Sequence, residues 1–290
     1  MRRLSLRHIL CPIDFSSLTQ GALTTASAMA RARHAELRAL HVMPSEGVAT
    51  PGGLGSLERQ ALMSRLRTSL AEAALSYDRV GAAVRQGDPG TQILRFARAM
   101  PADVIVMGAP GADRPERPMG SVTSVVVARS ECPVLTVPTH HAPWSNESGL
   151  FTRIVCAVDL APSSLNVIHQ ALSLAWETAG HVTYVCVLPE GVSKRSAVAR
   201  NRLLDAIPSE ASRWCETEVL VLRGTPGTEI VRIAEKQKAD LVVIGAPRRW
   251  TSTTHAVLSR SFCPVLVTHD ARPLPRPTTT RRHDTVHTAV

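Results

Sequence analysis

Short apolar runs alternate with longer amphipathic segments along most of the 290-residue chain. Runs such as VIVMG at 104–108 and LVVIG at 241–245 are apolar at consecutive positions, which is typical of strands buried on both faces of a sheet. In the first half, the pattern predicts strands at 8–13, 36–43, 79–85, 102–107 and 133–137 and helices at 17–33, 56–75, 90–99 and 121–129. Five strands alternating with helices predict an α/β fold, in which a doubly wound parallel sheet carries helices on both faces.

The second half of the chain repeats the first. The segment GDPGTQILRFARAMPADVIVMGAP aligns without a gap with GTPGTEIVRIAEKQKADLVVIGAP, while Asp14 matches Asp159 and Cys132 matches Cys263. Because these blocks recur in one order, we predict two tandem domains of one fold. Their expected limits are 1–138 for the first domain, 139–151 for a polar linker, 152–269 for the second domain and 270–290 for a disordered basic tail.

The last predicted strand of each copy is short and apolar, reading PVLTV at 133–137 and PVLVT at 264–268. Exposed edges of this kind invite pairing with another strand.

Composition limits the class of protein. Hydrophobic residues make up 44% and charged residues 20% of the chain, as in ordinary globular proteins. Aromatic residues are only 3%, so aliphatic side chains must build the cores and aromatic stacking platforms for nucleic acid are unlikely. The net charge is +9, but five of these excess charges fall in residues 1–8 and 270–290. The predicted domains are therefore not basic enough to favour nucleic acid as a partner.

The chain also lacks signals for a membrane or an oxidising compartment. No apolar run approaches the roughly 18 residues that a membrane-spanning helix needs, and the N-terminal sequence does not fit a signal peptide. The six cysteines form no CxxC pair, which predicts free thiols rather than a disulfide framework or a zinc site. A cytoplasmic protein without a metal site is expected.

Candidate binding residues follow the first and fourth strands. Ligands of open parallel sheets bind beyond the carboxyl ends of the strands, where the strand order reverses. Asp14 follows the first strand, Gly108 ends the fourth, and Gly111 and Gly120 would let the backbone approach a ligand closely. Gly120 also precedes the helix at 121–129, whose N-terminus favours a phosphate. This arrangement predicts a nucleotide site.

Two further hydroxyls, on Ser121 and Thr123, are candidate hydrogen-bond donors to that phosphate. A purely structural interpretation competes with the ligand role. An Asp after a strand often caps the next helix, as Ser16 and Thr19 also can, and glycines after a strand often form only a turn.

Several motifs resemble those of one known family. PIDFS, LHV, GDPGTQIL, ADVIVMG, GSVTSVVV and CPVLTV are similar to segments of the universal stress protein family, and the resemblance covers both repeats. It implies a Rossmann-like, five-stranded parallel sheet in each domain, related to the adenine nucleotide alpha hydrolases. It also implies ATP as the ligand of the first domain, with no Mg²⁺ ligands assigned. Because members of the family often associate through their last strand, the resemblance further implies that the two domains pair through 133–137 and 264–268, and association of two chains into a homodimer is a further expectation.

In ATP-binding members the motif is G-x2-G-x9-G-(S/T). The resemblance implies that Asp14 and Val42 contact adenine and ribose and that the glycines and Val122 hold the phosphates. The candidate site comprises Pro12, Ile13, Asp14, Val42, Met107, Gly108, Gly111, Gly120, Ser121, Val122 and Thr123. This chain departs from the motif, since eight rather than nine residues separate Gly111 from Gly120 and Pro110 stands where a basic residue is common. Arg114 and Arg117 are candidates to supply that charge.

The second repeat has lost the phosphate motif. After Gly245 it reads APRRWTSTTHAV, without a second glycine, and Thr251 aligns with Gly120. We therefore predict that the second domain is a degenerate, structural partner. Arg248 and Arg249 are interpreted as a solvated surface pair rather than as an anion site.

Motifs of common enzymes are missing from the chain, including GxxxxGK(S/T), GxSxG and HExxH. The family resemblance implies an ATP-binding protein of the stress response, and the missing motifs predict that it has no catalytic residue, although weak ATP hydrolysis stays open. The alternative is a stress-related interaction scaffold that binds no nucleotide.

Overall fold

A computed structural model describes residues 6–44, 56–74, 77–109, 119–139, 151–161, 164–191, 196–246 and 251–269. The first domain contains β1 (His8–Pro12), α1 (Ser17–Arg33), β2 (Glu36–Met43), α2 (Ser56–Ala74), β3 (Val80–Gln86), α3 (Pro89–Ala99), β4 (Val104–Ala109), α4 (Ser121–Arg129) and β5 (Val134–Pro138). The predicted order of elements is confirmed, and most of their ends fall within one residue of the prediction.

The second domain repeats this order. It contains β6 (Arg153–Ala157), α5 (Ser164–Trp176), β7 (His181–Leu188), α6 (Ser196–Ala206), the 3₁₀ helix η2 (Ser209–Arg213), β8 (Glu216–Arg223), α7 (Pro226–Lys236), β9 (Leu241–Gly245), α8 (Ser252–Arg260) and β10 (Val265–Thr268). The short helix η2 was not among the predicted elements.

The fourth strand begins two residues later than the sequence pattern predicts. The Asp103 carboxylate accepts hydrogen bonds from the backbone N–H groups of Arg7 and His8 at 2.6 and 2.9 Å, so this residue belongs to the turn before β4. Asp240 does the same in the second domain, where it accepts from the N–H groups of Thr152 and Arg153 at 2.8 and 3.0 Å. An acidic residue thus fixes the amino ends of the two central strands in both copies.

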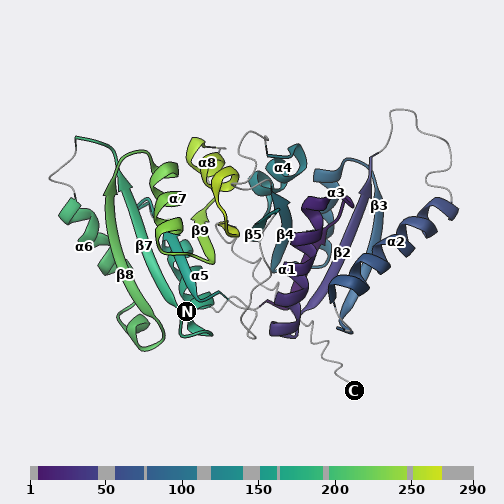
Figure 1. The fold of residues 1–290 in the computed structure, drawn as a ribbon, viewed down its shortest axis with the longest axis horizontal. Helices are drawn as coiled ribbons and strands as arrows, with labels where there is room; N and C mark the ends of the chain where they lie inside the picture. The colour runs from purple at the N-terminus through teal and green to yellow at the C-terminus, as the bar shows by residue number, and fades with distance from the viewer. Residues whose placement is uncertain are drawn as a thin grey trace, which may run out of the picture.

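All ten strands form one sheet, in the order β3-β2-β1-β4-β5-β10-β9-β6-β7-β8. Strands are parallel within each domain, and the two domains meet where β5 and β10 pair antiparallel, with Leu135 opposite Leu266. The expected pairing of the two last strands is therefore present, and the two halves lie side by side about this junction (Figure 1). The strand order reverses between β1 and β4, and again between β6 and β9, which fixes one switch point in each domain.

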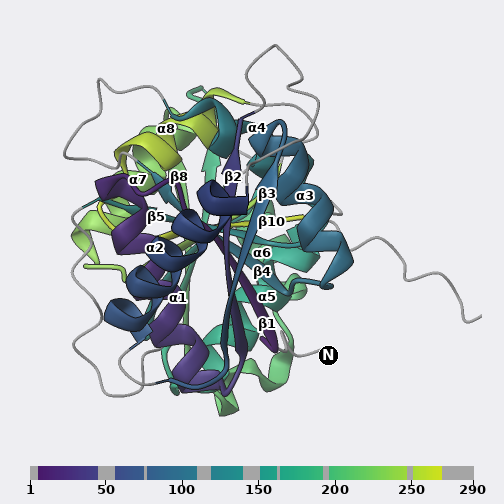
Figure 2. The same cartoon turned by 90° about the vertical axis from the view of Figure 1, so that its right-hand side faces the viewer.

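Helices cover both faces of the sheet, as Figure 2 shows for α1 and α2 on one side of the strands and α3 on the other. The buried residues form two clusters, one under α1, α2 and α5 and one under α3, α4, α7 and α8. Successive residues of β1 belong to different clusters, since Ile9 packs in the first cluster and Leu10 in the second. The described cores are built mainly from Ala, Val, Leu and Ile, as the low aromatic content requires.

Side-chain contacts reinforce the junction between the domains. The Thr136 hydroxyl donates to the backbone oxygen of Val265 at 3.3 Å, and His269 Nε2 donates to the backbone oxygen of Val127 at 2.7 Å. Arg33 at the end of α1 forms an ion pair with Glu177, which follows α5. These contacts hold helices of both domains against the shared sheet.

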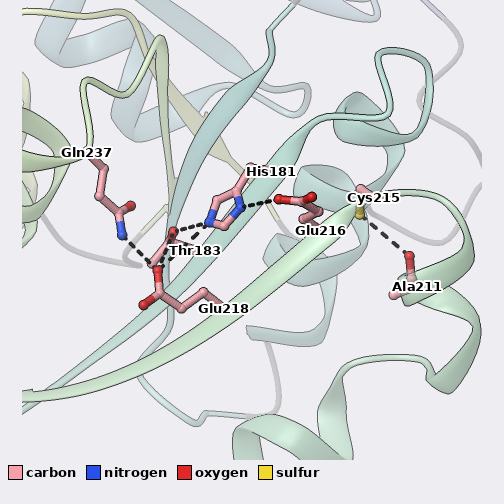
Figure 3. A network of polar contacts seen from close by, with 7 residues as sticks. All are labelled: His181, Thr183, Ala211, Cys215, Glu216, Glu218 and Gln237. Atoms are coloured by element: carbon pink, nitrogen blue, oxygen red, sulfur yellow. Dashed lines mark hydrogen bonds and ion pairs between the residues drawn. The ribbon is translucent and has the colours of Figure 1, made fainter.

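A polar network lies at the opposite end of the second domain from the switch point. Figure 3 shows His181 at the start of β7 between Thr183 and Glu216, while Glu218 accepts from Gln237 at 2.9 Å. Because these residues begin β7 and β8 and end α7, the network fixes the amino ends of the outer strands and takes no part in the candidate site.

Part of the predicted linker and the whole predicted tail, 270–290, lie outside the described residues. Phe151, which we placed in the linker, is 3% exposed and packs in the first core cluster, because a large apolar side chain next to β6 is buried there. Within the part of the chain that the structure describes, no helix combines the length and apolar character that crossing a membrane requires.

Candidate functional site

Asp14 stands directly beyond β1, at the switch point of the first domain. Its Oδ1 accepts hydrogen bonds from the backbone N–H of Ser16 at 2.9 Å and from the Thr19 hydroxyl at 3.2 Å. Burial disfavours the charged carboxylate, but the hydrogen bonds from Ser16 and Thr19 outweigh it, and together they hold the pKa of Asp14 below its ordinary value. Asp14 therefore anchors the turn into α1 as an ionised acceptor.

The residue after this aspartate has an unusual backbone conformation in both domains. Phe15 has φ 62° and Leu160 has φ 63°, a left-handed conformation that bulky side chains rarely adopt. The Phe15 ring lies 4.6 Å from that of His41, and the Arg65 guanidinium lies 4.1 Å above it. Retention of this conformation in both copies shows that the turn after the first strand is a feature of the fold. The hydrogen bonds to the neighbouring aspartate offset its strain.

Four predicted site residues, Pro12, Ile13, Val42 and Met107, lie at or near the carboxyl ends of β1, β2 and β4. Ile13 is 5%, Met107 5% and Val42 9% exposed, and Val42 and Met107 share the second core cluster. The backbone oxygen of Ile13 accepts from His41 Nδ1 at 2.7 Å, which joins the ends of β1 and β2. These four residues are thus mainly core residues whose backbone borders the switch point.

Gly108 has a packing role that the sequence did not indicate. A methyl group added at this position would overlap the backbone of α1, with its Cβ 2.7 Å from the Leu18 carbonyl carbon. The missing side chain therefore lets α1 lie close to β4, whether or not a ligand approaches from the other side. The Gly108 carbonyl accepts a long hydrogen bond, 3.5 Å, from the Thr123 hydroxyl of α4.

Gly120 differs from Gly108, because the fold leaves space around it. The nearest atom to an added Cβ is Thr123 Oγ1 at 3.9 Å, and φ is −54°, a value that any residue adopts. Gly120 is the N-cap of α4 and supplies no side-chain hydrogen bond to the helix. Ser121 is exposed and Val122 half-buried at this end, and no side chain among the described residues caps the first N–H groups of α4. Gly111 lies outside the described residues.

The equivalent place in the second domain holds a cavity of about 690 Å³. It lies at the carboxyl ends of β6, β7 and β9 and is lined by Asp159, the counterpart of Asp14, and by Val158 and Val187, the counterparts of Ile13 and Val42. Thr251 and Thr254 at the start of α8 close the cavity on another side. The cavity was not predicted, since the loss of the glycine motif suggested a domain without a ligand site.

Thr251 caps the start of α8, whereas no described side chain caps the start of α4. Thr251 Oγ1 accepts from the backbone N–H of Thr254 at 3.2 Å and lies 3.0 Å from the Thr254 hydroxyl. Thr251 stands at the position that corresponds to Gly120 in the first domain. Its hydroxyl therefore occupies one of the N–H groups at the start of α8 that could otherwise bind a phosphate. The two domains thus present different chemistry at equivalent positions.

Three features of these sites went unrecognised in the sequence. The ring pair of Phe15 and His41 has no local motif, because Phe15 lies in the turn after β1 and His41 lies in β2. The packing role of Gly108 depends on how closely α1 lies above β4. The threonines of the second domain had a signal in the run TSTT at 251–254, which marks a capped helix start. Among the described residues, no group of three or more His, Cys, Asp or Glu side chains is placed to hold a metal ion.

Comparison with known proteins agrees with this architecture. The model of the universal stress protein family matches residues 5–138 and again residues 150–269. A curated universal stress protein of Methanocaldococcus jannaschii is 29% identical over 143 residues, which cover 42% of this chain and 84% of that protein.

Among solved structures, a universal stress protein from Archaeoglobus fulgidus is 21% identical and has a TM-score of 0.71, with 90% of this chain and 98% of that chain covered. A protein from Pseudomonas aeruginosa is 19% identical with a TM-score of 0.65, covering 92% and 94%. At these identities the structures show a shared fold. Because the family model matches both halves of the chain, and the fold agrees in both, the protein belongs to the universal stress protein family as a tandem member.

Proposed function

We propose that the first domain binds an adenine nucleotide, ATP, at the switch point between β1 and β4, and that the protein acts in the stress response. The N-terminus of α4, which no described side chain caps, carries this proposal, because free N–H groups at the positive end of a helix favour a phosphate. Family membership supports the role in stress.

Asp14 suits the base or the ribose of such a ligand. Asp14 accepts with Oδ1 from Ser16 and Thr19, and no described residue donates to its Oδ2. A carboxylate with one free oxygen accepts from a ribose hydroxyl or an exocyclic amine. The ionised state of Asp14 at neutral pH, which its lowered pKa favours, suits that acceptor role.

The proposed activity is binding without a catalytic residue, in the cytoplasm. All six cysteines of the chain are free, which suits a reducing compartment. The second domain supports the first through the shared sheet, since β10 covers the edge of β5.

Gly120→Asp tests the proposal in the full chain. Aspartate is a good N-cap, so the free energy of unfolding should stay equal or rise by a few tenths of a kcal/mol. ATP affinity, measured by isothermal titration calorimetry, should fall at least tenfold, because the new carboxylate occupies the helix N-terminus and repels phosphate. Asp159→Asn in the second domain is the matched control and should leave ATP affinity unchanged.

Two results would contradict the proposal. Wild-type protein that releases no heat with millimolar ATP would favour the interaction scaffold instead. ATP affinity that is unchanged in Gly120→Asp would place any nucleotide elsewhere.

A further inference from the structure

A hydrogen bond crosses from the second domain to α4, the helix that carries the proposed phosphate site of the first. His269, the residue directly after β10, lies with its Nε2 2.7 Å from the backbone oxygen of Val127 in α4. A carbonyl oxygen only accepts, so Nε2 is the donor, which both the protonated ring and the neutral ring with its proton on Nε2 allow. A side chain of the second domain is thus fixed to α4, next to the junction (Figure 1).

The acceptor is a group for which α4 itself provides no donor. The helix ends at Arg129, so the Val127 carbonyl is among its last four, which lack an N–H donor within the helix. Histidine side chains can hydrogen-bond such carbonyls. Val127 is 1% exposed, and a buried carbonyl without a donor is costly. His269 therefore caps the carboxyl end of α4 from the other domain.

His269 is itself held by the second domain. Its backbone oxygen accepts from the side-chain amide of Asn166, Nδ2, at 2.7 Å, and Asn166 lies in the first turn of α5. The preceding residue is fixed in the sheet, since Thr268 of β10 pairs with Gly245 of β9. A strand and a helix of the second domain thus fix the backbone from which the imidazole reaches α4.

The equivalent positions of the first domain cannot make this contact. Pro138 stands at the position of His269, and Gly21 stands at that of Asn166. Neither residue has a side-chain donor. The backbones still approach each other as in the second domain, because a Cβ added at Gly21 would lie 3.8 Å from the Pro138 oxygen. The fold therefore forms at one of its two equivalent places without this link, which is not a general requirement of the architecture.

We propose that His269 is a positioning residue for the nucleotide site of the first domain and acts through α4. The helix has nine residues, so its two ends belong to one rigid body about 14 Å long. Near its N-terminus the hydrogen bond from the Thr123 hydroxyl to the Gly108 oxygen is long, 3.5 Å, whereas that from His269 is 2.7 Å. The shorter bond fixes where α4 lies and hence where its first N–H groups point. That these groups meet a nucleotide rests on the proposed function.

This contact gives the second domain a part in binding, although its own glycine motif is lost. By thermodynamic linkage, a contact that strengthens ATP binding is strengthened to the same degree by bound ATP. Occupation of the first domain is therefore transmitted to His269 and, through Asn166, to α5 of the second domain.

Calorimetry with ATP on the full chain tests this role with variants at position 269. His269→Leu removes the donor at a similar volume and should raise the dissociation constant about three- to tenfold, the range that one hydrogen bond contributes. His269→Gln keeps an N–H donor at the end of the side chain and should stay within about twofold of wild type. Asn166→Ala should weaken ATP in the same direction but by less, because it releases only the backbone of His269.

Glu177→Gln is the matched control, because it breaks another contact between the domains, the ion pair with Arg33, and leaves His269 in place. This variant should keep the ATP affinity of wild type. Hydrogen exchange of the α4 amides without nucleotide gives a second measurement that does not depend on ATP. Exchange should be faster in His269→Leu than in wild type, His269→Gln and Glu177→Gln.

ATP affinity that is the same in His269→Leu as in wild type would overturn the inference and leave the nucleotide site intact. A loss in Glu177→Gln as large as that in His269→Leu would also overturn it, since general loosening of the junction would then suffice. Wild-type protein that releases no heat with ATP would contradict the proposed function instead. Hydrogen exchange then decides whether His269 holds α4, and unchanged exchange in His269→Leu would overturn that as well.

Discussion

Replacing Gly108 with alanine should destabilise the first domain, whereas the same change at Gly245 should not. At Gly108 the added Cβ would lie 2.7 Å from the carbonyl carbon of Leu18, and because this obstacle is backbone, α1 has to move away from β4. Overpacking of this kind costs about 1–3 kcal/mol. At Gly245 the nearest atom is a side-chain methyl group, Val167 Cγ2 at 3.2 Å, which has to give way by only a few tenths of an ångström.

Both substitutions also restrict the unfolded chain, which favours folding by about 0.4–1 kcal/mol at each site. The expected result is therefore a loss of about 1–2 kcal/mol for Gly108→Ala and a change near zero for Gly245→Ala. Urea unfolding of the full-length protein without nucleotide measures both. Equal free energies of unfolding for the two variants would refute the packing role of Gly108. Close approach of a ligand would then be the only role left for this glycine.

Other predictions concern the cap, the domain junction and titratable groups. Thr251→Ala should cost about 1 kcal/mol of unfolding free energy, since it removes the N-cap of α8, and thermal unfolding would show this. Glu177→Gln should lower the thermal midpoint by more than the loss of an exposed ion pair would, because the Arg33 side chain is largely buried. An unchanged midpoint would count against this contact. Burial raises the pKa of Cys263 to about 12, so alkylation at pH 8 should be slow until the protein unfolds. The pKa of Asp14 is lower in the folded protein than the value of about 3.9 expected for the unfolded chain. Ionised Asp14 therefore stabilises the fold at a pH above the unfolded pKa, and this contribution is lost as the pH falls through the folded pKa. The stability difference between wild type and Asp14→Asn should accordingly shrink on acidification, as urea unfolding at several pH values would show.

The order of elements was predictable because the strands are continuous apolar runs bounded by turn residues. The helix at 17–33 and the strand at 36–43 were located at their observed residues for this reason. Strand pairing at the junction was also predictable, because the family resemblance implied it and an apolar last strand in both copies needs a partner.

What the sequence could not show depends on distances between segments far apart in the chain. The need for glycine at position 108 arises from Leu18, which lies ninety residues earlier. The cavity of the second domain is a volume left between β6, β7, β9 and the helices α5, α7 and α8, and no local pattern encodes a void. Loss of a glycine motif indicated a lost phosphate site, but it could not indicate whether the rest of the pocket had closed.

The antiparallel pairing of β5 with β10 has a consequence for how the two sites can evolve. In a symmetric dimer of identical chains, every substitution appears in both subunits, so both sites change together. Here the two partners are encoded separately within one polypeptide, and their association does not depend on protein concentration. A glycine at position 120 and a threonine at position 251 can therefore coexist across one interface, an asymmetry that a dimer of identical subunits could not maintain.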